Sequence, residues 1–120
     1  MSVMLQRRRN HVKPPPEGCP LSVCLAIIGG AWTPNIIWYL SRQPRRFTEL
    51  RGDIPEISAK VLSARLKKLE TDGVVIRQVL STSPPSVEYS LSLHGQELMP
   101  AIEAIANVGH RLKELGMAQG

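Results

Sequence analysis

The sequence contains few cysteines and no long hydrophobic run. Cys19 and Cys24 are the only cysteines among the 120 residues, so cysteine alone supplies neither a disulfide framework nor a four-ligand zinc site. The longest apolar stretch, residues 21–28, is far shorter than the roughly 20 residues of a membrane span. The first residues also lack the order of a charged region followed by an apolar region that marks a secretory signal. We therefore expect a cytoplasmic protein with no membrane partner.

Residue sets that would support catalysis are also missing. The sequence offers no nucleophile with its base, no paired carboxylates, no glycine loop for phosphate and no metal cluster at a usable spacing. His11, His94 and His110 are scattered along the chain, where a lone histidine is more often structural than catalytic. We therefore expect no enzyme activity, no cofactor and no metal.

Positive charge predominates, and it is unevenly distributed. The formal net charge is +5, and basic residues lie mainly in 1–18 and 42–77, whereas 78–120 is acidic on balance. This asymmetry favours a polyanionic partner that contacts the middle of the fold. With 42% hydrophobic residues, the composition is that of one folded domain rather than of a disordered chain.

Two short helices are predicted at the start of the domain. Pro20 suits the first position of a helix that continues through apolar residues to Ile28 and stops at Gly29-Gly30. Thr33 is expected to cap a second helix, which ends before Gln43-Pro44.

A helix-turn-helix pattern follows. After an extended link at Phe47, Thr48 is expected to cap a short helix that ends at Asp53. Ser58 then opens the most regular segment, in which leucines recur at helical spacing until Gly73. Two helices joined by a tight turn are typical of DNA-binding domains.

The second half of the chain predicts a hairpin and a long helix. Residues 74–80 are predicted to form a strand, residues 87–93 alternate as a second strand does, and a proline-containing loop joins them. Residues 95–115 carry apolar side chains near heptad spacing, and Pro100 is expected to kink or restart this helix. The predicted fold is mainly α with a small β-hairpin (α+β), a winged helix-turn-helix. The expected segments are a flexible basic arm over 1–18, the DNA-binding domain over 19–95, a dimerisation helix over 96–116 and a tail over 117–120.

The predicted recognition helix, from Ser58 to about Asp72, has an outer face suited to DNA. If its leucines point inward, small and basic residues point outward, and the small ones permit close approach to the major groove. Lys60 could reach a base edge or a phosphate, and Lys67 a phosphate. The candidate contacts on this helix are Ser58, Ala59, Lys60, Ser63, Ala64, Lys67 and Lys68. Arg45 and Arg46 are expected to add contacts to the DNA backbone.

Two alternatives to this interpretation remain open. The lysines could be only the solvated side of an amphipathic helix, although the preceding turn and the following hairpin favour DNA contact. The domain could also be a winged-helix module that binds proteins through its acidic C-terminal third. The basic central segment argues against that second alternative.

Cys19 is a candidate sensor. It directly precedes Pro20 and so lies near the start of a predicted helix, where the helix dipole favours a reactive thiolate. The alternative is an inert thiol at a dimer interface. Cys24 lies inside the apolar run and is expected to belong to the core.

Several strings of residues, in this order, resemble the HxlR-type branch of the MarR-like winged-helix regulators. They are Cys19-Pro20, Ile28-Gly29-Gly30-Ala31-Trp32, Arg46-Phe47-Thr48-Glu49-Leu50-Arg51, Ile54-Pro55 with Ile57-Ser58, Leu66 with Leu69-Glu70 and Asp72-Gly73, and Pro84-Pro85 with Val87-Glu88-Tyr89-Ser90-Leu91. The resemblance implies a bacterial or archaeal cytoplasmic homodimer, paired through its first and last helices, on a palindromic operator in double-stranded DNA. It also implies that Cys19 occupies a position where some members sense oxidants or electrophiles such as quinones and aldehydes.

The chain departs from the resembled pattern at three positions. Ala31 stands where the family often has Lys, Ser86 where a basic wing residue usually follows the prolines, and Val108 where Trp is frequent. Ser86 remains a candidate DNA contact, but a less basic wing is expected to hold phosphate less firmly. Lys60 and Lys67 would then carry a larger share of the binding.

Overall fold

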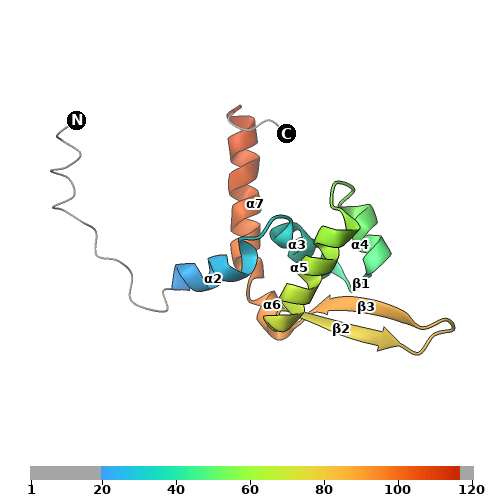
Figure 1. The fold of residues 1–120 in the computed structure, drawn as a ribbon. Coiled ribbons are helices and arrows are strands. Elements are labelled where there is room, and N and C mark those ends of the chain that lie inside the picture. The colour runs from blue at the N-terminus through green and yellow to red at the C-terminus, as the bar shows by residue number, and fades with distance from the viewer. Residues whose placement is uncertain (1–19, 117–120) are drawn as a thin grey trace, which may run out of the picture.

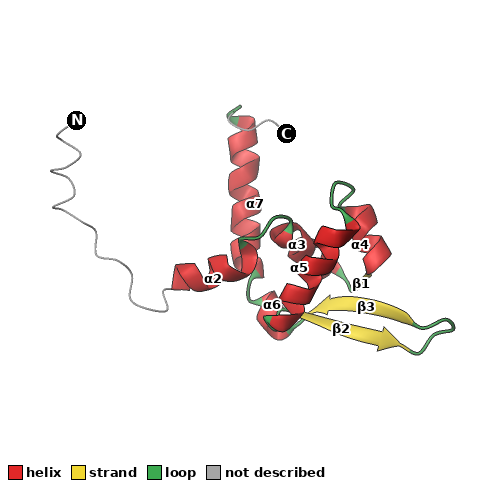
Figure 2. Cartoon of the chain, viewed as in Figure 1, coloured by secondary structure: helices red, strands yellow, loops and turns green. Residues whose placement is uncertain are grey.

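A computed structural model of the chain describes residues 20–116 (Figure 1). Within that range the chain forms helices on one side and a small antiparallel sheet on the other (Figure 2), which confirms the predicted winged helix-turn-helix fold. The elements are α2 (Pro20–Ile28), α3 (Thr33–Arg42), β1 (Arg45–Arg46), α4 (Phe47–Asp53), α5 (Ala59–Thr71), β2 (Val75–Leu80), β3 (Ser86–Leu91), α6 (Leu93–Gln96) and α7 (Met99–Glu114).

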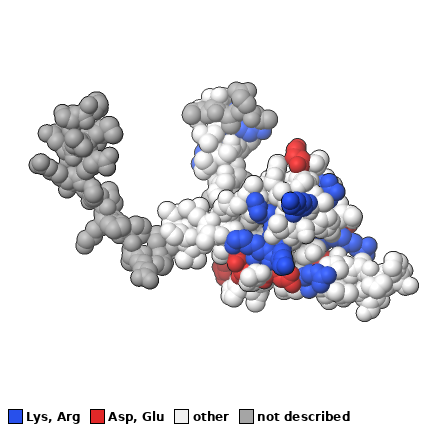
Figure 3. Space-filling model, in the orientation of Figure 1, with Lys and Arg blue, Asp and Glu red and all other residues white. Residues whose placement is uncertain are grey.

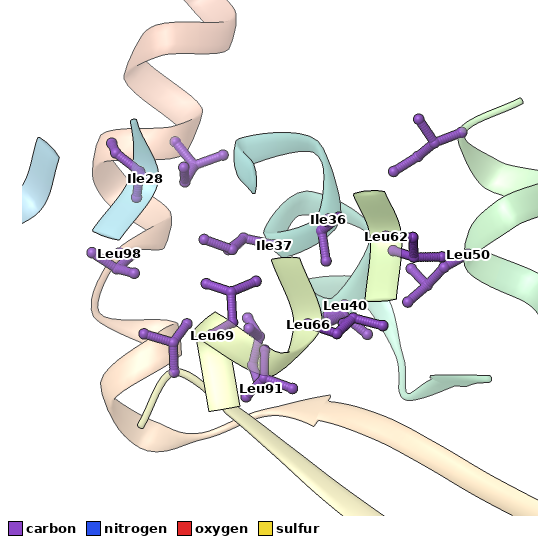
Figure 4. Packing of buried hydrophobic residues seen from close by; sticks show 14 of the residues in the cluster. Ile28, Ile36, Ile37, Leu40, Leu50, Leu62, Leu66, Leu69, Leu91 and Leu98 are labelled. Atoms are coloured by element: carbon purple, nitrogen blue, oxygen red, sulfur yellow. The ribbon is translucent and has the colours of Figure 1, made fainter. Parts of the chain in front are cut away.

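The core is centred on α3 and orients α5. Ile36 and Ile37 of α3 are fully buried, and the leucines of α5 point toward them (Figure 4). Leu62, Leu66 and Leu69 are at most 1% exposed. Because all three leucines occupy one side of a helix, burying them fixes the opposite side toward solvent.

Both ends of α5 form as predicted. The backbone N–H of Val61 donates to Ser58 Oγ at 3.1 Å, so Ser58 is the N-cap. At the other end Gly73 adopts a φ of 77°, and the N–H of Val74 donates to the carbonyl of Leu69 at 2.9 Å. This glycine-terminated C-cap satisfies carbonyls that the helix leaves unpaired.

The predicted caps of the two preceding helices are wrong. Trp32, with a φ of 68°, is the N-cap of α3, and Thr33 is its buried first residue. Helix α4 begins at Phe47 rather than after an extended link, and its N-cap is Arg46 instead of Thr48. The Arg46 N–H donates to Glu49 Oε1 at 2.8 Å, so a carboxylate three residues into the helix replaces the expected hydroxyl cap.

The wing contains one more strand than predicted. The β2–β3 hairpin is present, and β1 adds to its open edge, giving the order β1-β3-β2. Arg45 pairs with Tyr89, and Arg46 pairs with Glu88. β1 has only two residues, too few to show an alternating pattern, and it is a strand because it pairs with β3.

The chain leaves the wing earlier than predicted. Strand β3 ends at Leu91, and Leu93 starts α6 with 81% of its surface exposed, so the predicted continuation of the strand to Leu93 is wrong. Ser92 causes the change, because its Oγ accepts from the N–H of Gly95 at 3.0 Å and donates to the carbonyl of Gly73 at 2.6 Å. A Cβ at Gly95 would collide with the carbonyl oxygen of Val74.

The predicted long helix is divided in two. α6 ends at Gln96 and α7 starts at Met99, with Pro100 in its first turn. Of the two effects predicted for Pro100, the restart is therefore confirmed. Leu98 and Ile102 anchor the start of α7 in the core, and the rest of the helix extends away from the body (Figure 1).

No single helix within residues 20–116 is both long and apolar enough to cross a bilayer. α2 and α3 reach the necessary hydropathy only as a pair, which is bent by 83°.

Candidate nucleic-acid interface

The outer face of α5 is basic and exposed to solvent. Figure 3 shows Lys and Arg side chains gathered over and around this helix. The predicted contacts on α5 and its N-cap, Ser58, Ala59, Lys60, Ser63, Ala64, Lys67 and Lys68, are all exposed. Small residues and lysines therefore share one solvent-facing surface, as a helix that enters the major groove requires.

Two of the predicted cations are engaged in ion pairs. Arg45 donates to Asp53 through two bonds, Nε to Oδ2 at 3.0 Å and Nη2 to Oδ1 at 2.9 Å, which join β1 to the end of α4. The hydrogen bonds to Asp53 raise the pKa of Arg45 above its usual value. Lys68 Nζ lies 2.8 Å from Asp72 Oδ2 on the surface of α5. An exposed pair of this kind opens at little cost, whereas the bidentate pair has a positioning role.

Arg46 is exposed at the start of α4, where its backbone forms the cap already described. Arg46 is also the second residue of β1, so an exposed cation lies where the strand meets the helix.

Arg65 was not among the predicted contacts, and it holds α5 in place. Its Nε donates to the carbonyl of Ala31 at 2.9 Å, linking α5 to the turn between α2 and α3. Nothing in the local sequence indicates this bond, because the two residues are 34 positions apart.

A hollow between α5 and the wing, hereafter the α5–wing hollow, contains two further residues that the sequence interpretation missed. It measures about 350 Å³ and is lined by Ser63, Lys67, Glu70, Arg77 and Tyr89. Arg77 of β2 and Tyr89 of β3 are cross-strand partners. Pairing the two predicted strands in register would have put both side chains on one face of the wing.

The tip of the wing is uncharged. No Lys, Arg, Asp or Glu occurs from Gln78 to Val87. Ser86 begins β3 half-buried, with its Oγ 3.2 Å from Thr82 Oγ1, and the Thr82 hydroxyl donates to the carbonyl of Pro84 at 2.7 Å. Ser86 is therefore part of the internal hydrogen bonding of the loop.

Apolar side chains are exposed on α2 and α7, the first and last helices of residues 20–116. On α7, Ile105, Val108, Leu112 and the adjoining Leu115 are between 38% and 72% exposed. On α2, Leu21, Val23 and Leu25 are between 52% and 66% exposed. A groove of about 330 Å³ between α3 and α7 adds Trp38, whose ring lies 4.5 Å from the guanidinium of Arg42. Clusters of exposed apolar side chains are typical of surfaces that contact another molecule.

The candidate sensor Cys19, the arm over 1–18 and the tail over 117–120 lie outside the described residues. Cys24 is half-buried in α2 and packs against the core, as expected. Within residues 20–116, no three His, Cys, Asp or Glu side chains are grouped closely enough to hold a metal ion.

Comparison with known proteins identifies a family and several relatives. The family model of HxlR-like helix-turn-helix proteins matches residues 27–116. An uncharacterized HTH-type transcriptional regulator of Bacillus subtilis, YdeP, is 40% identical over 98 residues, which span 82% of this chain and 77% of YdeP.

Solved structures of related regulators superpose on this chain over most of its length. The redox regulator HypR in its reduced form superposes with a TM-score of 0.75 at 33% identity, covering 80% of this chain and 95% of HypR. A MarR-family regulator from Porphyromonas gingivalis gives a TM-score of 0.76 at 37% identity, covering 82% of this chain and 97% of that protein.

Proposed function

Because the chain belongs to the HxlR-like helix-turn-helix family, a family of transcriptional regulators rather than of enzymes that is related to the MarR family, we propose that α5 reads a specific DNA operator. The N-terminal half of α5 would enter the major groove, since recognition helices contact bases mainly with their first turns. Lys60 would then reach a base edge, and Ser63 and Ala64 would permit close approach. Arg46 would contact the DNA backbone.

The orientation of α5 carries this proposal. Its leucine face is buried in the core, its two ends are capped and Arg65 ties it to the α2–α3 turn. The lysine face is consequently turned toward solvent, where a ligand can approach it. Preorganised cations and small side chains on a rigid helix are what groove recognition needs.

We further propose that the protein acts as a homodimer on a palindromic operator in the bacterial or archaeal cytoplasm. The exposed apolar faces of α2 and α7 support this, because a second copy would bury both by two-fold symmetry. Two recognition helices related in this way contact half-sites about one helical turn, or roughly 10 bp, apart.

The salt dependence of binding tests the DNA proposal. The purified protein is titrated with fluorescent genomic fragments that it has selected, from about 50 to 200 mM salt. A steep linear fall of log affinity with log salt is expected if lysines and arginines displace counterions from phosphates. No binding even at low salt would instead favour the winged-helix module that binds proteins.

A redox or electrophile response at Cys19 is the second part of the proposal. Its support is the position of Cys19 immediately before α2, together with the likeness to HypR, a redox regulator. A quinone or aldehyde would form a carbon–sulfur bond with the Cys19 thiolate, whereas hypochlorous acid would transfer its oxygen to the sulfur, giving a sulfenic acid and chloride.

The response is tested by measuring operator affinity with and without quinones, aldehydes and hypochlorite. Cys19→Ser is expected to lose the change in affinity, and the matched Cys24→Ser to retain it. A Cys19→Ser protein that still responds fully would exclude this residue as the sensor.

A further inference from the structure

We propose that the α5–wing hollow binds one phosphate of the DNA backbone through Lys67 and Arg77. The inference rests on the proposed DNA binding and adds a named contact to it. It moves the wing's contribution from its tip, where the sequence interpretation placed Ser86, to its base.

The elements converge on this hollow from two directions. Ser63, Lys67 and Glu70 recur at intervals of three to four residues and so share one side of α5. Arg77 and Tyr89 face them from paired positions of β2 and β3. An ammonium group, a guanidinium group and two hydroxyls therefore surround one space, and all four groups donate hydrogen bonds.

The charges of the hollow are available to a ligand. Among residues 20–116, Arg45 and Lys68 form ion pairs, whereas the side chains of Lys67 and Arg77 take part in no ion pair or hydrogen bond. Both residues are exposed. Two uncommitted cations that flank one hollow provide a cleft for an anion, and a guanidinium matches the geometry of phosphate oxygens.

The position of Lys67 along α5 favours a contact with a backbone phosphate over a contact with a base. Lys67 lies two turns beyond Lys60, toward the C-terminal end of the helix, which stays nearer the groove edge when the N-terminal end penetrates. The strand that borders the groove would then pass between α5 and the wing. The uncharged wing tip offers no cation for this contact, whereas Arg77 near the base of the wing does.

Glu70 opposes the same phosphate. Its carboxylate lines the hollow together with the two cations, so it lowers the local positive charge. We therefore expect Glu70 to weaken non-specific binding to DNA. The base contacts of α5 would then determine which sequences are bound most tightly.

The test compares Arg77→Gln and Lys67→Gln with the double variant on operator and on random duplexes. Each single change is expected to weaken binding roughly tenfold on both duplexes and to lower the salt slope by about one. If the two cations share one phosphate, the double variant loses less than the product of the single losses. Lys113→Gln on α7 removes the same charge away from the hollow and should leave affinity unchanged.

Glu70→Gln is expected to tighten binding several-fold on random DNA. Unchanged affinity and slope in Arg77→Gln, with the wild-type protein still strongly salt-dependent, would overturn this inference and leave the proposed function intact. Failure of the wild-type protein to bind DNA would remove both.

A free anion is separated from a DNA phosphate by titrating inorganic phosphate at constant ionic strength. We expect no saturable binding by phosphorus NMR. Saturable binding that Arg77→Gln abolishes would instead assign the hollow to a small anion and overturn the proposal.

Discussion

Helices α5 and α7 carry similar apolar repeats, yet they bury them differently. The leucines of α5 are at most 1% exposed, because α3 and α4 cover them. On α7 only Ile102, near the start, is buried to a similar degree, whereas Val108 and Leu112 are 43% and 38% exposed. Apolar residues at the same helical spacing therefore pack into the core of the chain in α5, whereas in α7 they form an exposed surface.

The comparison shows what apolar periodicity encodes. It defines a face that must be covered, but it does not say whether the cover comes from the same chain. For α5 the cover is internal, so its polar face is presented rigidly. For α7 it would come from a second copy. The predictions below test this difference.

The largest effect is expected from shortening a leucine of α5. Leu66→Ala removes a fully packed side chain and should lower the free energy of unfolding by about 2 to 5 kcal/mol. The matched Leu112→Ala, measured at a concentration where the protein is monomeric, should cost under about 1 kcal/mol. Urea denaturation followed by circular dichroism gives both values, and equal losses would contradict the comparison.

A charge on the α7 surface should break the dimer without unfolding the domain. Val108→Glu would bury an unpaired carboxylate at the proposed interface, raising the dimer dissociation constant at least about 30-fold. Sedimentation velocity measures the shift. Glu103→Gln, on the opposite side of α7, is the control, and an unchanged dimer in Val108→Glu would show that α7 pairs elsewhere.

Removing an uncommitted lysine of α5 should affect DNA more than stability. Lys60→Ala is expected to weaken operator binding by roughly 1 to 3 kcal/mol if the side chain reads a base. Fluorescence anisotropy on operator and random duplexes measures it. An equal loss on both duplexes would reassign Lys60 to a phosphate.

The smallest effect is expected at Lys68, whose charge is paired. Lys68→Ala breaks an exposed contact to Asp72 and should cost about 0.3 kcal/mol in unfolding free energy. Its operator affinity should fall less than that of Lys67→Ala. A larger loss at Lys68 would mean that the ion pair opens on DNA.

Local patterns predicted the parts of this fold that local forces determine. The N-cap at Ser58 and the C-cap at Gly73 are set by side chains and backbone within a few residues, and both follow from residue type. The outward lysines follow from the position of the leucines. These features already define the candidate surface.

The features that were missed depend on distant partners. Strand β1 exists because Arg45 and Arg46 pair with Tyr89 and Glu88, more than 40 residues away in the sequence. The commitment of Arg45 to Asp53 and of Arg65 to Ala31 likewise needs the folded chain. A sequence shows which side chains are cations, but only the fold shows which of them are already engaged within the protein.

The junction at Ser92 gives the molecule a fixed reach. Its hydroxyl joins the end of α5 to the start of α6, and Gly95 packs against Val74 without space for a methyl group. These contacts hold α5 in a fixed position relative to α6, which leads into α7. In a dimer joined through α7, the distance between the two copies of α5 would therefore be fixed. DNA whose half-sites are separated by the same distance would be bound without bending. DNA with any other half-site spacing would have to deform in order to contact both helices.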